Sequence, residues 1–302
     1  MRVCLNSVTD VTNHDLFLAV RLKGSLSRTA GGFISLLKMA LGRKKMKRSF
    51  PLIFTALVTL TTFSPISRAA NMQIPFLPGE KLTLQVRWAF IPAGEVQLEI
   101  LPFEMVKGVK SYHFAMTAKT SPLVDLFYKV RDRVDAYTDA EMTHSLLYKK
   151  KQQGKSKRNI VVNFDWKKRE AQYSNFDEQR EPVTISPGSF DPLSVFYAFR
   201  LFALKEGIKI KASVTDGKKL VHGEAAVLKK EKIYVADKWY ETYLVEPDLK
   251  HIGGIFKKSK NAKLRIWVTA DKQRIPIKIK SKVAVGSFVA ELVSYEPGKS
   301  LP

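Results

Sequence analysis

Residues 79–88 read Gly-Glu-Lys-Leu-Thr-Leu-Gln-Val-Arg-Trp. Within them the apolar side chains of Leu82, Leu84, Val86 and Trp88 alternate with polar ones. Successive side chains of a β-strand point to opposite faces, so this alternation predicts a strand with one face in a core and the other in water. The same pattern recurs along most of the chain that follows, and we therefore expect a mainly β protein.

Further alternating runs predict about a dozen strands in all. They centre on residues 96–100, 112–118, 130–137, 146–150, 160–164, 170–174, 208–214, 220–229, 239–245, 264–269, 275–283 and 287–295. The connections are short, with turn residues at Pro92-Ala93-Gly94 and at Asp216-Gly217. Because short connections join antiparallel neighbours, we expect an antiparallel meander that curls into a barrel-like or two-layer β fold.

One central helix is expected at about 191–206. Asp191 is a good N-cap, Pro192 suits the first turn, and apolar residues from Leu193 onward repeat at helical spacing. The segment 122–128 is expected to form one or two helical turns. The central helix would cross between the halves of the sheet or close one end of it.

An export signal is expected early in the chain, starting at Met46 rather than at the first residue. A basic region at 43–48 precedes a short apolar run, Leu52–Phe63, and small residues follow that run. The apolar run is shorter than the roughly 20 residues of a membrane-spanning helix. We therefore expect signal cleavage between Ala69 and Ala70, a periplasmic or secreted protein, and no transmembrane anchor after cleavage.

This signal divides the chain into three parts. Residues 1–45 are expected to be a disordered extension produced by a start codon placed too early, and an amphipathic presequence is the alternative. Residues 46–69 are the predicted secretory signal peptide. Residues 70–302 are expected to form a single exported β domain with its core at 76–296.

The exported part is basic and free of cysteine. The chain has 51 Lys and Arg against 28 Asp and Glu, a net charge of +23, and residues 70–302 keep 40 against 26, or +14. Cys4 is the only cysteine, which excludes disulfides, thiolate metal sites and a lipidated N-terminal cysteine from the exported part. We expect partners among anionic envelope lipids or acidic polysaccharides rather than nucleic acids, unless the charge serves only solubility.

No catalytic, cofactor-binding or metal site is expected. No two histidines of the exported part stand at metal-ligand spacing. Carboxylate pairs for acid–base chemistry lack a recognisable context, and Asp132 with Asp135 lies in an alternating charged run that fits an exposed strand face. The other pairs considered are Asp177 with Glu178 and Asp237 with Glu241. The chain is therefore expected not to be an enzyme.

A basic cluster is the first predicted surface site. Six cations are expected to meet at a hairpin tip around 152–154, namely Lys149, Lys150, Lys151, Lys155, Lys157 and Arg158. Crowding like charges costs stability, so the cluster predicts anion binding. A sheet edge protected by lysines against aggregation is the alternative.

A second surface site is predicted after Gly253-Gly254. There Ile255 and Phe256 are followed by Lys257 and Lys258. Apolar residues flanked by lysines suit contact with a membrane surface or with a partner protein. A solvated hairpin tip is the alternative.

Five motifs share a pattern. They are Phe76-x-x-Gly79-Glu80-x-Leu82, Ala93-Gly94, Asp191-Pro192-Leu193-Ser194 with Tyr197 and Arg200, Asp216-Gly217-Lys218, and Ile266-Trp267-Val268-Thr269-x-Asp271-x-x-Arg274-Ile275-Pro276. Together they resemble the exported bacterial family called domain of unknown function 3108, over about Phe76–Glu296. The resemblance implies an antiparallel β fold curled around a helix, similar to a lipoprotein of capsule-export systems. It implies no activity, cofactor or catalytic residue.

Each motif also has a structural interpretation. Asp191 should cap the helix, and Arg200 should pair with a buried carboxylate or line a cleft. Trp267 is expected to anchor the core, and 271–274 to form a tight turn before a strand.

Three functions stay open on this basis. The first is a periplasmic non-enzymatic protein that binds an anionic or amphipathic envelope component, a polysaccharide or a lipid. The second is a protein–protein scaffold of an envelope export machine, and the third is an envelope hydrolase. If side chains fill the interior of the β fold, a binding site must lie on the surface. An interior cavity of about 300 Å³ or more would instead suit a small ligand.

Overall fold

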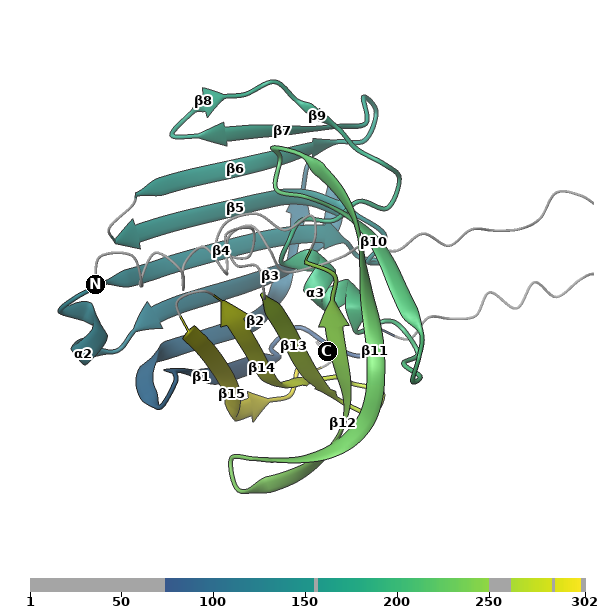
Figure 1. The fold of residues 1–302 in the computed structure, drawn as a ribbon. Helices are drawn as coiled ribbons and strands as arrows, with labels where there is room; N and C mark the ends of the chain where they lie inside the picture. Colours follow the sequence, from purple (N-terminus) through teal and green to yellow (C-terminus); the bar gives the residue numbers. More distant parts are fainter. Residues whose placement is uncertain (1–73, 155–156, 250–261, 284–285, 300–302) are drawn as a thin grey trace, which may run out of the picture. The chain divides into compact units, whose positions relative to one another are not determined.

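The computed structural model describes residues 74–154, 157–249, 262–283 and 286–299 (Figure 1). The predicted extension, the signal peptide with its cleavage site at Ala69 and Ala70, and the predicted contact residues 255–258 lie outside these ranges.

Two runs of strands make up the described residues. The first run consists of β1 (Lys81–Trp88), β2 (Ile91–Val106), β3 (Val109–Thr120), β4 (Val130–Asp139), β5 (Ser145–Gly154), β6 (Arg158–Asp165), β7 (Glu170–Asn175), β8 (Glu178–Gln179) and β9 (Val183–Thr184). The second consists of β10 (Lys209–Thr215), β11 (Leu220–Val235), β12 (Lys238–Pro247), β13 (Lys263–Thr269), β14 (Pro276–Val283) and β15 (Gly286–Glu296). The described residues also form two short helices, α2 (Pro122–Asp125) between β3 and β4 and α3 (Ser194–Phe199) between the runs.

All these strands belong to one antiparallel sheet, as the meander predicted. Within each run, neighbours in sequence are mostly neighbours in the sheet (Figure 1). The runs are joined by β15 pairing with β1, from Lys81 opposite Glu296 to Trp88 opposite Phe288. The sheet order is therefore β10 to β15, then β1 to β8, with β9 beside β7.

The core lies around α3 and uses side chains from both runs. The Tyr197 ring stacks on Phe114 of β3, with 4.1 Å between ring centroids. Phe196, one residue earlier, lines a pocket together with Val245 of β12 and Ile266 of β13. Helix α3 therefore packs between the two runs, and the expected sheet curled around a helix is confirmed.

The turn between β10 and β11 brings the second run back against the first. A Cβ added to Gly217 in this turn would lie 2.9 Å from both methyl carbons of Val162 in β6 and 3.0 Å from the Cβ of Tyr173 in β7. Phe190, which lies between the two runs, donates its amide to the Ser213 carbonyl of β10 at 3.0 Å. Side-chain packing and this short backbone bridge therefore close the sheet at this point.

Helix α3 is shorter than the predicted 191–206. After Phe199 the hydrogen bonds run from residue i to residue i−3, as in Leu201 to Ala198 at 3.1 Å and Phe202 to Phe199 at 3.2 Å. Such bonds form a tighter 3₁₀-like turn. The apolar spacing of the sequence fits both geometries, which is why it overestimated the helix.

The first hairpin also differs from its prediction. The turn lies at Ala89 and Phe90, and the predicted turn residues Pro92, Ala93 and Gly94 lie inside β2. Ala89 takes up the positive φ of the turn, 52°. Gly94 is required for another reason, because a Cβ there would lie 2.2 Å from the Lys119 carbonyl oxygen of β3. It allows a close approach of two strands.

Candidate functional site

Four large apolar side chains are exposed near the start of β2 and on the β3–β4 connection. The exposed fractions are 87% for Phe90, 60% for Leu123, 77% for Leu126 and 72% for Phe127. Single exposed apolar residues are normal on protein surfaces, but a group of them marks an interaction site. We call these four residues the apolar tip.

Helix α2 is held against the beginning of β2. The Ser121 amide donates to the Ala93 carbonyl and the Ser121 hydroxyl donates to the Pro92 carbonyl, both at 2.9 Å. Val124, the buried residue of α2, packs with Ala93 and with Val86 of β1. These contacts fix α2 beside the strand that follows Phe90.

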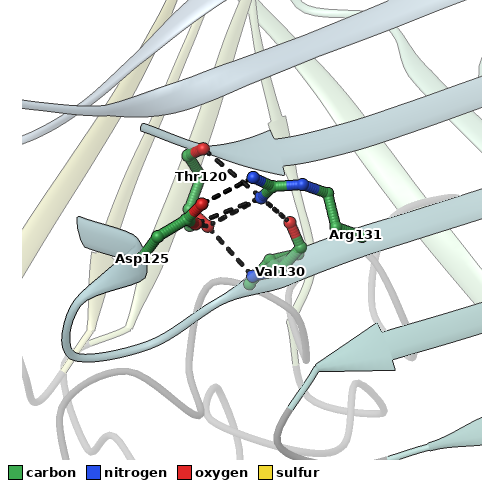
Figure 2. Close-up of polar contacts among 4 residues, drawn as sticks. All are labelled: Thr120, Asp125, Val130 and Arg131. Atoms are coloured by element: carbon green, nitrogen blue, oxygen red, sulfur yellow. Dashed lines mark hydrogen bonds and ion pairs between the residues drawn. The ribbon is translucent and has the colours of Figure 1, made fainter. Parts of the chain in front are cut away.

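A polar brace holds the base of the α2 loop (Figure 2). Arg131 donates to both carboxylate oxygens of Asp125, at 3.1 Å to Oδ1 and 2.5 Å to Oδ2. The Thr120 hydroxyl donates to Asp125 and accepts the Val130 amide at 2.9 Å. Arg131 also donates to the Val130 carbonyl at 2.5 Å. The brace thus ties the end of β3, the helix and the start of β4 together.

The charge of the brace persists at neutral pH. Hydrogen bonds from Arg131 and then Thr120 hold the pKa of the Asp125 carboxyl below its ordinary value. The carboxylate is therefore ionised at neutral pH, where the arginine is also charged. The loop consequently presents Leu123, Leu126 and Phe127 from a fixed base, which lowers the ordering entropy that binding would otherwise cost.

Cations lie beside the apolar tip. Lys129 is exposed and follows the loop directly. Its carbonyl oxygen would lie 2.2 Å from a Cβ on Gly154, so the end of β5 touches this segment. Lys157 and Arg158 follow β5 across the connection to β6. Among the described residues, no ion pair within 4.0 Å links Lys129, Lys157 or Arg158 to a carboxylate.

The structure separates the predicted basic cluster. Strand β5 continues to Gly154, so in β6 the residues opposite Lys149 and Lys151 are Val161 and Asn159 rather than Lys157 and Arg158. Both are exposed, whereas Lys150 points to the other face and is 1% exposed. Lys157 and Arg158 lie near the apolar tip, as described above, and Lys155 is outside the described residues. The expected meeting of all six cations at one tip was wrong, because strand alternation divides them between two faces.

The predicted carboxylate pair is also divided. Asp132 is buried on the inner face of β4, where it accepts a hydrogen bond from Gln152 at 3.0 Å. Asp135 lies on the other face, 2.9 Å from Nε2 of His113, whose Nδ1 is 2.7 Å from Glu104. A separation of three residues along a strand places two side chains on opposite faces. Asp132 and Asp135 therefore do not share a site.

Of the other predicted pairs, Asp177 and Glu178 lie in the exposed β7–β8 turn. Asp237 accepts from the Tyr234 hydroxyl at 3.3 Å, whereas Glu241 pairs with Lys230 at 3.5 Å. In the described ranges, no group of three or more His, Cys, Asp or Glu side chains could hold a metal ion.

The described pocket between α3 and β11–β14 is small. Its lining is mostly apolar and includes Phe199, Ile266 and Pro276, together with Arg200 and Arg274. It leaves about 20 Å³ for the centre of a water-sized molecule, close to the need of one water. This pocket is therefore too small for a lipid or a sugar.

Sequence reasoning missed the apolar tip as a site. It predicted helical turns at 122–128, which α2 confirms, but treated them as structural. The signal was present, because Leu-Phe at 126–127 stands in a segment too short to bury all its apolar side chains and next to Lys129.

Comparisons with known proteins concern the fold and the family. A family model described as "Protein of unknown function (DUF3108)" matches residues 83–293. No curated protein matches the sequence. Of the described residues, no helix is long and apolar enough to cross a membrane.

Three solved structures are distantly similar. The β-barrel-like DUF1849 protein of Brucella abortus is 8% identical, with a TM-score of 0.49, and covers 74% of this chain and 99% of its own. A Parabacteroides distasonis protein provisionally described as a lipoprotein is 9% identical, with a TM-score of 0.31 and coverages of 74% and 98%. A Bacteroides fragilis protein provisionally described as exported, with a YmcC-like fold, is 9% identical, with a TM-score of 0.29 and coverages of 73% and 98%. At these scores nothing about the site follows from them.

Proposed function

This chain belongs to the DUF3108 family of proteins of unknown function, and we propose that it is an exported, non-enzymatic protein that binds the anionic lipid surface of the cell envelope through the apolar tip. The observation that carries the proposal is the exposure of Leu126 and Phe127 on a braced loop beside the exposed Lys129, with Phe90 exposed in the neighbouring β1–β2 turn. Export rests on the predicted signal at 46–69.

The chemistry of the tip suits a membrane interface. Phenylalanine and leucine side chains enter the boundary between head groups and acyl chains, while lysines stay at the charged surface. A fully buried Phe or Leu side chain contributes about 1.5–3 kcal/mol, and each cation near an anionic surface about 1 kcal/mol. Four partly inserted side chains, together with the exposed Lys129 and Lys157, therefore support reversible binding.

Vesicle co-sedimentation tests the proposal. The purified protein should bind vesicles of phosphatidylglycerol and phosphatidylethanolamine more strongly than vesicles of phosphatidylcholine. The double variant Leu126→Ser, Phe127→Ser should lose most of this binding. Raising the salt concentration should weaken binding in part, because salt screens the cations and leaves the apolar contribution.

Met105→Ser is the matched control. Met105 is 67% exposed and lies near the β2–β3 turn, at the opposite end of the strand from Phe90. The proposal is wrong if this control loses as much vesicle binding as the tip variant, or if the parent protein does not bind anionic vesicles at low salt. A stoichiometric protein partner that is lost with the tip variant, without vesicle binding, would favour the scaffold hypothesis instead.

A further inference from the structure

The β11–β12 hairpin extends beyond the strands that flank it. Strand β10 pairs with β11 only as far as Ala226, and β13 pairs with β12 only from Thr242 onward. Residues 228–241 therefore form a two-stranded arm, which we call the hairpin arm; its turn lies beyond β13 (Figure 1). Ala236 and Asp237 in the turn both have positive φ, as a two-residue hairpin turn requires.

The arm carries an aromatic pair on its outward face. Tyr234 lies directly opposite Trp239, with 5.2 Å between ring centroids and 56° between ring planes. They are 53% and 62% exposed. The Lys232 ammonium lies 5.7 Å from the centroid of the Trp239 ring.

The arm is anchored by its other face. Ile233 and Tyr240, opposite each other there, pack against the main core, and Val235 is buried. The Trp267 indole N–H donates to Glu231 at 2.8 Å. The hairpin therefore has its own attachment to the core, and the exposed aromatic pair is not needed to provide it.

The composition of the arm favours a ligand other than a β-strand. Lysines along an unpaired strand edge discourage pairing with another chain. Lys230 and Lys232 occupy the aromatic face. Glu241 lies directly opposite Lys232 and forms a long pair with Lys230, at 3.5 Å, while the Asp237 carboxylate is held by the Tyr234 hydroxyl at 3.3 Å. The two rings, tilted by 56° to each other, offer two adjoining apolar faces, with the Lys232 ammonium beside the Trp239 ring.

We propose that this face of the hairpin arm binds an acidic polysaccharide. The C–H groups of a pyranose ring form an apolar face whose hydrogens carry partial positive charge, and they stack on the negative face of an aromatic ring. Trp239 and Tyr234 would each contact one sugar, and Lys232 would meet a carboxylate of the chain. The inference uses residues separate from the apolar tip and does not depend on the proposed function.

Isothermal titration of the purified protein with alginate oligomers, a polyuronate, tests the inference at about 50 mM salt, where the screening length is more than 10 Å. Dextran of equal length is the neutral comparison. Alginate should bind and dextran should bind much more weakly. Trp239→Ala should weaken alginate binding about tenfold, the loss of one stacking contact, and Trp239→Phe should keep most of it.

Two lysine variants test which face of the hairpin arm binds alginate. Lys232→Gln should weaken alginate binding, whereas Lys238→Gln, opposite Val235 in the register and so on the other face of the arm, should leave it unchanged. Lys232→Gln keeps the aromatic pair and serves if Trp239→Ala does not fold. The inference is overturned if alginate does not bind, or if the Lys232 and Lys238 variants lose affinity equally. It is also overturned if Trp239→Ala folds and binds as tightly as the parent.

Discussion

Arg200 and Glu80 form a buried, two-pronged ion pair that joins the residue after α3 to the residue before β1. Nη1 of Arg200 lies 2.5 Å from Oε1 of Glu80, and Nη2 lies 2.9 Å from Oε2. The side chains are 1% and 2% exposed. Nε of Arg200 donates to the Gln273 carbonyl at 2.9 Å, and the guanidinium lies over the Phe76 ring. One side chain therefore connects three distant segments.

We predict that Glu80→Ala destabilises the protein by about 3–5 kcal/mol, because it leaves a buried guanidinium without its counter-charge. Urea denaturation monitored by circular dichroism measures the change. Lys81→Ala is the neighbouring control, since the Lys81–Glu99 pair is partly exposed and should contribute less than about 1 kcal/mol. Equal losses in both variants would contradict the importance given to the buried pair.

Gly217→Ala should destabilise the protein more than Gly108→Ala. Both glycines have nearly the same φ, +82° and +81°, so the backbone strain of a Cβ, about 1–2 kcal/mol, is common to the two variants. Only at Gly217 would the Cβ meet Val162 and Tyr173, which adds about 1–3 kcal/mol of overpacking. The difference between their unfolding free energies measures the contact that closes the sheet. Equal unfolding free energies for the two variants would mean that Val162 and Tyr173 move aside for the Cβ without destabilising the protein.

Asp191→Ala should cost about 2–4 kcal/mol, whereas Asp191→Asn should be nearly neutral. Oδ1 of Asp191 accepts the amides of Leu193 and Ser194 at 2.8 and 2.9 Å, and alanine would leave both buried donors without it. Burial raises the pKa of the Asp191 carboxyl, so an uncharged amide suits the site and keeps the acceptor. Thermal unfolding of the two variants separates them, and an Asn variant as unstable as the Ala variant would contradict this role.

The brace at the apolar tip should depend on pH. The Arg131 contact lowers the pKa of Asp125 in the folded protein. Its stabilisation is therefore complete above the unfolded value of about 3.9 and is lost as the pH falls through the lower folded value. Asp125→Asn should lower the unfolding free energy at pH 7 and have progressively less effect below pH 4. Glu181→Gln, which changes an exposed carboxylate that has no ion pair within 4.0 Å among the described residues, serves as the control for general charge effects.

Side-chain alternation predicted most strands because it depends on neighbouring residues alone. The motifs predicted that Asp191 caps the helix, that Arg200 pairs with a buried carboxylate or lines a cleft, and that Trp267 anchors the core. In the structure Asp191 accepts the Ser194 amide, Arg200 pairs with the buried Glu80, and Trp267 is buried. The function of Gly94 was not predictable in the same way. A glycine after proline indicates a turn, whereas the constraint comes from Lys119, which only the folded sheet brings close.

The candidate site was harder to predict than the fold. The inward position of Lys150 was readable in principle, since Tyr148 and Gln152 share its face and all three are buried. The prediction treated the lysines as one cluster along the chain and did not assign them to the two faces of the strand. The exposure of Leu126 and Phe127 depends instead on the brace from Thr120 and Arg131, which turns the loop away from the core. No local pattern encodes that orientation.

The pairing of β15 with β1 sets a condition on how the protein folds. Lys81 has neighbours on both sides in the finished sheet, and one of them, Glu296, is more than two hundred residues away. Contacts between such distant residues slow folding, because a long loop must close before they form. Until the last strand arrives, β1 has one open edge that could pair with another chain. A chain of this design therefore needs protection from aggregation until its final strand has been made and has paired with β1.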